Sequence, residues 1–325
     1  MLEEVLGIWG NALVLIGSLV ALAFASGKTI DNSVKIADVT GFGRTTIGFI
    51  LVAFSTSLPE LLVSIFAALG QGSVGVAVGN VLGSNIVNIL LILGICFVIV
   101  TRKCPKYACF YPTMAKEELQ SLHFGLFVAS IVPLGLLYLE EASRFIGIIL
   151  LAIFAVYLYQ LSKVRTARDE GSLGEERSRL RRYSTLALAG IGGVVTSSYL
   201  IVDTASYLAR SVGIPGVVIG ATIVAFGTSV PELATSVAAT RKGHLDLALG
   251  NIIGSAFINI TCILGVTLVA SQFTVNIAAF SKLAIFSLIT NMFLWYFLSN
   301  ERLTWKEGTI FLFMYSIFLA TSFAS

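Results

Sequence analysis

The chain has 325 residues, of which 56% are hydrophobic and only 12% are charged, and its mean hydropathy is +0.91. A water-soluble protein of this length needs far more charge to cover its surface. The composition therefore excludes a soluble protein and predicts an all-α protein that crosses a membrane several times. A net charge of +3 says little about partners. We expect a lipid bilayer around the chain and no nucleic acid.

Apolar runs close to the roughly 20 residues that a bilayer requires recur along the whole chain. We expect ten membrane spans, several of which are long enough to tilt or to extend beyond the bilayer. They cover residues 8–27, 44–69, 74–99, 122–139, 143–162, 184–208, 213–240, 245–270, 273–298 and 305–323.

The two halves of the chain carry the same sequence pattern. VAFSTSLPEL at 52–61 aligns with VAFGTSVPEL at 224–233 at an offset of 172. GNVLGSNIVN at 79–88 aligns with GNIIGSAFIN at 250–259 at an offset of 171. Such self-similarity indicates an internal repeat.

Each copy of the repeat contains five predicted spans. Because five is odd, the copies must enter the membrane from opposite sides, which predicts an inverted repeat with broken helices at the midplane. The predicted division is a first repeat at 1–162 with its motif at 44–99, a basic linker at 163–183, and a second repeat at 184–325 with its motif at 213–270.

Basic residues are distributed unevenly between the two predicted sides. The side that holds the linker carries 18 of the 21 lysines and arginines. The positive-inside rule then places this side in the cytoplasm and both termini outside the cell membrane. The linker is interpreted as a topology anchor, with binding of anionic lipid or of a regulator as the alternative.

Two glutamates, Glu60 and Glu232, lie in the middle of apolar spans. A carboxylate near the bilayer centre is costly and is a functional hypothesis by default. Neither apolar core holds a basic residue, so protons or a metal ion should neutralise the pair. Pro59 and Pro231 each break the helix and free a backbone carbonyl four residues earlier, which would add oxygen ligands.

Helical spacing gathers further oxygen atoms near both glutamates. Hydroxyl residues stand three and four positions before each glutamate, and polar stripes at four-residue steps follow. These residues are Thr56, Ser57, Thr228, Ser229, Asn80, Ser84, Asn88, Asn251, Ser255 and Asn259. Such hard oxygen donors suit Ca2+, whereas zinc or copper would prefer nitrogen or sulfur. The alternatives are that a hydroxyl bonds its own backbone and that Asn80 and Asn251 only hold helices together.

Glycines, aromatic residues, cysteines and the polar residues outside the two motifs are interpreted as structural. Glycines at four-residue spacing should let the polar stripes approach the broken helices closely. These are Gly75, Gly79, Gly83, Gly250 and Gly254. Asp31 and Asp203 should be solvated or interfacial, and His244 and Asp246 should be exposed in a loop. Trp295 and Tyr296 should anchor the membrane interface, and the four cysteines should be free thiols.

The paired motifs resemble the two alpha-repeats of the calcium/cation antiporter superfamily, and are most similar to its sodium/calcium exchanger branch, over roughly 10–99 and 186–270. The resemblance implies ten helices in two inverted halves, alternating access, and Ca2+ moving against Na+ or H+. It implies no cofactor, and a monomer that is sufficient for transport. The implied ligands are Thr56, Ser57, Glu60, Ser84, Asn88, Thr228, Ser229, Glu232, Ser255 and Asn259, with the backbone oxygens of Ala53 and Ala225.

Two positions depart from the pattern of that superfamily. Ser55 stands where the motif usually has glycine, and Asn259 stands where some exchangers have aspartate, including those that co-transport potassium. The site then has two carboxylates, which leaves Na+ and H+ both open, with Na+ favoured by the TS-x-PE pattern. A cation channel is a rival class, although channels normally use a ring of subunits. The sequence does not support an enzyme, because His123 and His244 are both expected in loops.

Overall fold

The computed structural model of the chain describes residues 2–40, 44–69, 81–103, 116–139, 141–142, 144–161, 173–211, 225–270, 273–274, 277–299 and 304–323. Within these ranges the protein is helical, as predicted, apart from short turns and one pair of two-residue strands. β1 pairs antiparallel with β2, with Glu141 opposite Thr274 and Ala142 opposite Phe273.

In the following bounds, η marks a π-helical segment. The first half contains α1 (Leu2–Thr40), α2 (Arg44–Ile47), η1 (Gly48–Ala53), α3 (Phe54–Thr56), α4 (Leu58–Leu69), η2 (Val87–Leu93), α6 (Gly94–Lys103), α7 (Lys116–Leu139), β1 (Glu141–Ala142) and α8 (Arg144–Leu161). The second half contains α9 (Leu173–Ser211), α11 (Ala225–Thr228), α12 (Val230–Arg241), α13 (Leu245–Ile258), η7 (Asn259–Ile263), α14 (Leu264–Ala270), β2 (Phe273–Thr274), α15 (Ile277–Ser299) and α16 (Trp305–Phe323).

The helices follow the apolar runs of the sequence. α16 spans Trp305–Phe323, as predicted, whereas α1 and α9 are 39 residues each and extend well beyond their predicted spans. α9 begins at Leu173, so the second part of the 163–183 segment is helical. Among the described residues, three helices are long and apolar enough to cross a membrane by length and composition: Gly7–Thr40, Val81–Thr101 and Leu245–Ala270.

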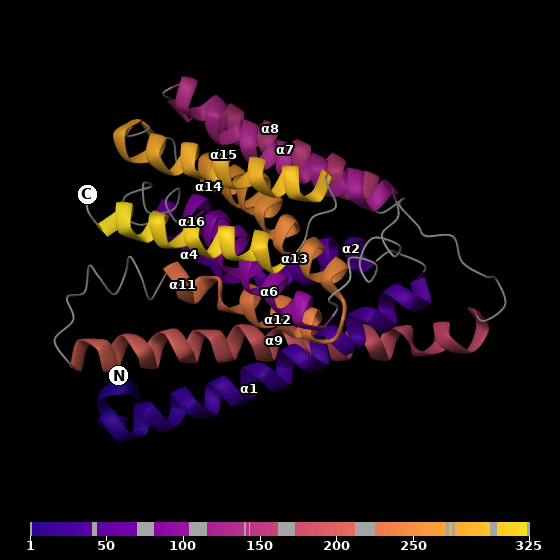
Figure 1. Cartoon of the computed structure of the whole chain (residues 1–325). Coiled ribbons are helices and arrows are strands. Elements are labelled where there is room, and N and C mark those ends of the chain that lie inside the picture. The colour runs from indigo at the N-terminus through magenta and orange to yellow at the C-terminus, as the bar shows by residue number, and fades with distance from the viewer. Residues whose placement is uncertain are drawn as a thin grey trace.

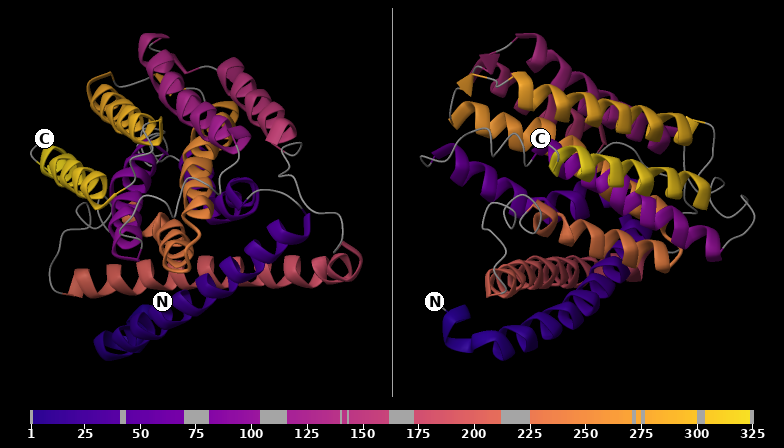
Figure 2. Two further views of the ribbon diagram at one scale, coloured as in Figure 1. Left: turned by 45° about the vertical axis from the view of Figure 1, so that its right-hand side comes forward. Right: turned by 60° about the vertical axis from the view of Figure 1, so that its left-hand side comes forward.

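The two long helices α1 and α9 lie side by side at one edge of the molecule (Figure 1). Figure 2 shows the same pair from two further directions, with α7 and α8 at the opposite edge. Gly190 of α9 allows the close approach, because a Cβ atom there would lie only 2.5 Å from Thr29 Oγ1 of α1. Small residues at helix crossings let membrane helices pack at short distance.

The distribution of side chains is that of a protein in lipid. Large apolar side chains point outward along α1, α8, α15 and α16, and many hydroxyl, amide and carboxyl groups are buried between the helices. Trp9 is 85% exposed and Phe145 is 70% exposed, whereas Glu60 is 1% exposed. Wide apolar surfaces of this kind are unfavourable in water and mark contact with a membrane. Trp295 and Tyr296 are both exposed, and their role as interface anchors stays a prediction.

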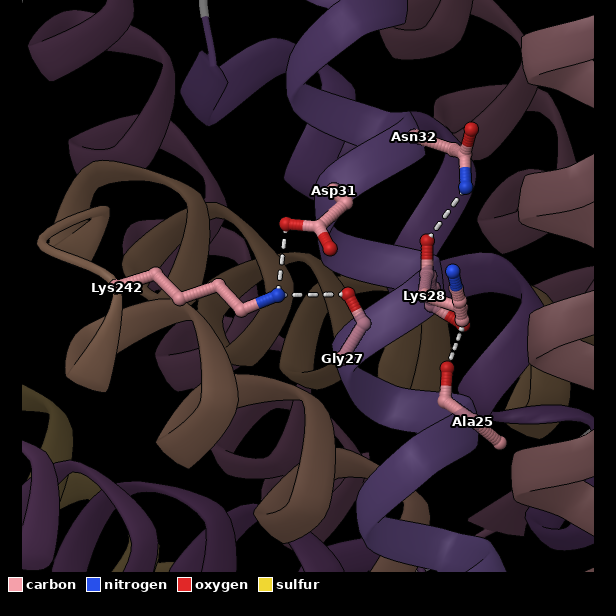
Figure 3. A network of polar contacts seen from close by, with 7 residues as sticks. Ala25, Gly27, Lys28, Asp31, Asn32 and Lys242 are labelled. Carbon is pink, nitrogen blue, oxygen red and sulfur yellow. Dashed lines mark hydrogen bonds and ion pairs between the residues drawn. The ribbon is translucent and has the colours of Figure 1, made fainter.

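One ion pair joins α1 to the turn between α12 and α13 (Figure 3). Lys242 Nζ lies 2.7 Å from Asp31 Oδ1 and donates a second hydrogen bond of 2.9 Å to the Gly27 carbonyl. The pair is partly exposed, so its contribution to stability is about 1 kcal/mol or less. The surface position predicted for Asp31 is confirmed, since half of its side chain is accessible.

Two of the loop placements are wrong. Asp246 is buried in the first turn of α13, where its Oδ1 accepts a hydrogen bond from the Leu247 amide. Carboxylates are stabilised at helix N-termini, so burial there costs less than in mid-helix. His123 belongs to α7 instead of a loop, and its Nε2 lies 3.2 Å from Ser299 Oγ of α15. Cys96 and Cys262 are free, as expected, and both are buried. The side chains of Asp203, Cys104 and Cys109 lie outside the described part.

Candidate cation site

Both motif helices break immediately before their glutamates. Ser57 separates α3 from α4 with φ −83° and ψ 6°, and Ser229 separates α11 from α12 with φ −89° and ψ 3°. The two breaks have nearly the same backbone geometry, as the sequence repeat requires. Glu60 and Glu232 consequently lie in the first turns of α4 and α12, where helix dipoles favour negative charge.

The two glutamates face a common interior. Both are buried, and their carboxyl groups lie close enough for their charges to interact. Each also lies beside a threonine of the other half, Glu60 beside Thr228 and Glu232 beside Thr56. Residues about 170 positions apart in the sequence are therefore neighbours in one polar centre.

Hydrogen bonds across the two halves connect this centre on the Glu232 side. Ser57 Oγ donates to Glu232 Oε1 at 3.2 Å, and Ser255 Oγ lies 3.3 Å from the same oxygen. Ser57 and Ser255 are themselves 3.1 Å apart. Ser57 and Ser255, one from each half, therefore form a closed triangle with one carboxylate oxygen of Glu232.

Several predicted ligands are buried and have unused polar atoms. Within the described ranges, no hydrogen-bond partner is present for either carboxylate oxygen of Glu60 or for Oε2 of Glu232. The same holds for the Ser84 and Ser229 hydroxyls, both amide atoms of Asn88, and Oδ1 of Asn259. Buried polar atoms without partners are costly, and a cluster of them needs an explanation such as an ion or ordered water. These atoms are nearly all oxygens, which suits a hard cation.

Asn251 has a different role from the other stripe residues. Its Nδ2 donates to Thr235 Oγ1 at 3.0 Å and to Ser236 Oγ at 2.9 Å, and its Oδ1 accepts from Thr56 at 3.3 Å. The amide is therefore fully used in joining α13 to α12 and α3. This pattern favours the helix-joining alternative for Asn251, whose partners Thr235 and Ser236 were not predicted from the sequence. Asn80 lies outside the described residues.

The backbone carbonyl oxygen of Ala53, near the first helix break, already accepts hydrogen bonds. The Ala53 carbonyl accepts hydrogen bonds from the Ser57 amide at 3.0 Å and the Thr56 hydroxyl at 3.3 Å. A cation at Ala53 would therefore replace the Thr56 contact. Ala225 is the first described residue of α11, and its role stays a prediction.

Two glycines allow the polar stripe of α13 to reach the first broken helix. A Cβ atom at Gly48 would lie 2.4 Å from the Leu247 carbonyl oxygen, and one at Gly254 would lie 2.9 Å from the Ala53 Cβ. The predicted close approach is therefore confirmed for Gly254, the residue next to Ser255. A Cβ atom added at Gly83 would meet no atom of another segment within 4 Å in the described part, and Gly75 and Gly79 lie outside it.

Three π-helical segments border the site, and the sequence did not predict them. η1 ends directly before α3, η2 contains Asn88, and η7 begins at Asn259. A π-turn inserts an extra residue and rotates the following side chains, and it occurs often at functional sites. η2 and η7 turn the two equivalent asparagines at equivalent places in the two halves.

The polar centre consists of oxygen donors in the part of the chain that the structure describes. No group of three or more histidine, cysteine, aspartate or glutamate side chains could hold a metal there. Two carboxylates with neutral hydroxyl and amide oxygens can instead balance a divalent or two monovalent cations. The arrangement fits reversible binding of a hard cation between two halves of one chain.

Several known proteins are similar to this chain. The sequence profile described as "Sodium/calcium exchanger protein" matches residues 10–163 and 183–324. The inner membrane protein YrbG of Escherichia coli is 32% identical over 84% of this chain and 83% of its own length. The sodium/calcium exchanger MaX1 of Methanosarcina acetivorans is 30% identical over 96% of this chain and 98% of its own length. A solved structure of the sodium-calcium exchanger NCX_Mj superimposes with a TM-score of 0.84 and 27% identity, covering 97% of this chain and 99% of that one.

The chain therefore belongs to the sodium/calcium exchanger family, within the calcium/cation antiporter superfamily that its motifs resemble. It is a membrane protein of the exchanger class, and the family is one of transporters, not of enzymes.

Proposed function

We propose that this protein exchanges Ca2+ for Na+ across the cell membrane by alternating access, with both ions binding between Glu60 and Glu232. The observation that carries the proposal is the pair of buried glutamates, one from each half, whose charges interact and of which three oxygens have no partner among the described residues. Two unpaired buried carboxylates are strongly unfavourable, so a bound divalent cation would stabilise the pair.

The predicted ligands have distinct roles in this proposal. Glu60 and Glu232 supply the charge, and Ser57 and Ser255 hold the Glu232 carboxylate and are themselves available to the ion. Ser84, Asn88, Ser229 and Asn259 supply neutral oxygens that are already free of other partners in the described ranges. Thr56 and Thr228 flank the two carboxylates, and Ala53 and Ala225 supply backbone oxygens.

Exchange follows from charge balance. With no cation bound, two negative charges remain in a buried centre, and rearranging the halves around them is unfavourable. Ca2+ or Na+ neutralises the pair and permits the change of access, so one ion can leave only if another takes its place. A ligand shifts such an equilibrium only through its different affinity for the two states.

The coupling ion is tested by comparing two gradients. In vesicles containing the purified protein, an outward Na+ gradient is expected to drive Ca2+ uptake at least about tenfold faster than an outward H+ gradient. A tenfold ratio corresponds to about 1.4 kcal/mol of discrimination between the two coupling ions. Radioactive Ca2+ accumulation measures both rates, with protein-free vesicles as the control. Uptake driven by H+ alone would identify a Ca2+/H+ antiporter on the same site. Currents without any counter-gradient would identify a cation channel.

We also propose ten transmembrane helices in two inverted repeats. Two glycine contacts support this, because they match between the halves. A Cβ atom at Gly308 of α16 would lie 2.7 Å from the Gly94 carbonyl oxygen of α6, and one at Gly147 of α8 would lie 2.7 Å from the Gly265 carbonyl oxygen of α14. Gly94 and Gly265 are equivalent at the offset of 171. In each case the third span of one half meets the last span of the other.

Three contacts between distant segments support the proposed ten-span topology, because each joins two loops or span ends on the same predicted side. Lys242 meets Asp31, His123 meets Ser299, and β1 pairs with β2. In a ten-span count, the first two contacts join loops or span ends on the linker side, and the third joins two loops on the opposite side. The positive-inside rule would then make the linker at 163–183 cytoplasmic and place both termini outside.

Sidedness can be tested with single cysteines in a variant that lacks Cys96, Cys104, Cys109 and Cys262. Arg182→Cys and Arg144→Cys form the pair, because both arginines are exposed, Arg144 at the first residue of α8 and Arg182 within α9 just before the predicted span at 184–208. A membrane-impermeant maleimide added to intact cells is expected to label only Arg144→Cys, and added to inverted vesicles only Arg182→Cys. The reverse pattern would contradict the proposed orientation.

A further inference from the structure

Asn85 stands out among the buried polar residues, because it contacts the second half of the chain but belongs to no predicted ligand set. Its Nδ2 lies 3.4 Å from the Ala256 carbonyl oxygen, and its Oδ1 lies 3.0 Å from Asn259 Nδ2. Asn85 follows Ser84 and precedes η2, which begins at Val87. It therefore links the two polar stripes.

The chemistry of these contacts determines how both amides are oriented. A backbone carbonyl can only accept a hydrogen bond, so Asn85 must turn its NH2 group toward Ala256. Its own carbonyl oxygen then faces Asn259, which must answer with its NH2 group. The Oδ1 atom of Asn259 is left on the other side, buried and without a partner in the described part of the chain.

The two halves differ at this point. The residue equivalent to Asn85 at the offset of 171 is Ala256, which has no polar side chain. Asn88, the equivalent of Asn259, accordingly has no fixed partner among the described residues for either amide atom. Among the described residues, one asparagine of the site is held in a single orientation and the other is not.

We propose that Asn85 is a positioning residue that fixes the Asn259 amide so that its carbonyl oxygen, and not its NH2 group, faces the cation. This inference rests on the proposed cation site between Glu60 and Glu232. It also accounts for the neutral residue at position 259. A carboxylate there has no hydrogen to donate to the Asn85 carbonyl oxygen, so the contact selects an amide and keeps the site at two negative charges.

The test measures equilibrium binding of radioactive Ca2+ to the purified full chain, with Na+ as competitor. Asn85→Ala and Asn259→Ala are each expected to weaken Ca2+ binding about tenfold, the effect of losing roughly one buried hydrogen bond or neutral ligand. The double variant is expected to bind within about twofold of Asn259→Ala, because Asn85 acts only through Asn259. In vesicles, Asn85→Ala should raise the KM for Ca2+ and leave the maximal rate within about twofold, if binding and not rearrangement is affected.

The control is Thr290→Val, which removes a buried hydroxyl of α15 that bonds only its own helix at Phe286. Unchanged Ca2+ binding by Asn85→Ala, or losses that multiply in the double variant, would overturn the positioning role. Asn85→Ser serves as a second variant whose shorter side chain cannot span both contacts. If both Asn85 variants fail to fold while Thr290→Val folds, Asn85 is a folding residue and the inference is wrong.

Failure of the proposed function gives a different result. A wild-type protein that binds Ca2+ but shows no uptake with a Na+ gradient would refute Na+ coupling and leave the binding comparison intact. A wild-type protein that binds neither Ca2+ nor Na+ would overturn both proposals.

Discussion

Glu232→Gln and Glu60→Gln are each expected to abolish Na+-driven Ca2+ uptake. Each change removes one of two charges from a buried centre in which the remaining oxygens are neutral. Breaking a buried pair of opposite charges costs about 3–5 kcal/mol, and each substitution would break one such pair, between a carboxylate and the bound Ca2+. Each 1.4 kcal/mol corresponds to about tenfold in affinity. Ca2+ binding should therefore weaken by roughly a hundredfold or more. Uptake of radioactive Ca2+ into vesicles measures the effect.

The matched control for these variants is Glu307→Gln. Glu307 also lies in the first turn of its helix, α16, where it accepts a hydrogen bond from the Thr304 amide at 3.0 Å. The control therefore loses the same charge at the same helical position, away from the site. Its uptake should remain within about twofold of wild type, since a surface charge at a helix end contributes only about 0.3–1 kcal/mol. Uptake that persists in Glu60→Gln or Glu232→Gln would contradict the site.

Thermal stability separates the two roles that a buried glutamate can have. In the absence of Ca2+ and Na+, Glu60→Gln should melt no lower than wild type, because it removes a carboxylate that has no partner in the described ranges and is repelled by Glu232. A marked drop in melting temperature would show that Glu60 is structural.

Gly48→Ala is expected to disrupt the packing of η1 against α13. The added Cβ atom would lie 2.4 Å from the Leu247 carbonyl oxygen and 3.1 Å from the Asn251 amide nitrogen, both of them backbone atoms. Backbone cannot turn aside as a side chain can, so the helices must separate. Overpacking of this kind costs about 1–3 kcal/mol or more. The melting temperature and the yield of monodisperse protein should both fall.

Gly17→Ala provides the comparison for Gly48→Ala. Gly17 lies within α1, and a Cβ atom added there would meet no atom of another segment within 4 Å among the described residues. The added methyl group therefore points into open space. Alanine is the better helix former by up to about 1 kcal/mol, so this variant should be as stable as wild type or more so. If Gly48→Ala melts like Gly17→Ala, the close approach of η1 and α13 is wrong.

Much of the site could be predicted from the sequence, because its main features are local or repeated. The positions of Glu60 and Glu232 in apolar runs identify a charged centre inside a membrane, and the matching TS-x-PE segments show that each half supplies one. The helix breaks were also predictable, since Pro59 and Pro231 cannot donate a backbone hydrogen bond. The breaks themselves occur at Ser57 and Ser229, two residues before each proline.

The burial of Asp246 and the place of His123 in α7 show where local inference fails. A polar residue near a loop is expected to be exposed, yet Asp246 is buried. Its carboxylate accepts a hydrogen bond from the Leu247 amide in the first turn of α13. Asn85 was missed for a related reason. Its partners Ala256 and Asn259 are more than 170 positions away, and no local spacing connects them.

The sequence by itself determined the class of protein, the approximate spans and the pair of acidic breaks, because hydropathy, proline and repetition act over short stretches of chain. Only the tertiary structure decided which hydroxyl meets which carboxylate, that Asn251 is used in joining helices, and that Asn85 orients Asn259. These outcomes depend on how far each helix is rotated, which π-segments such as η2 and η7 change, and on close packing at Gly48 and Gly254. Rotation and packing are set by contacts between the two halves, and those contacts exist only once the chain has folded.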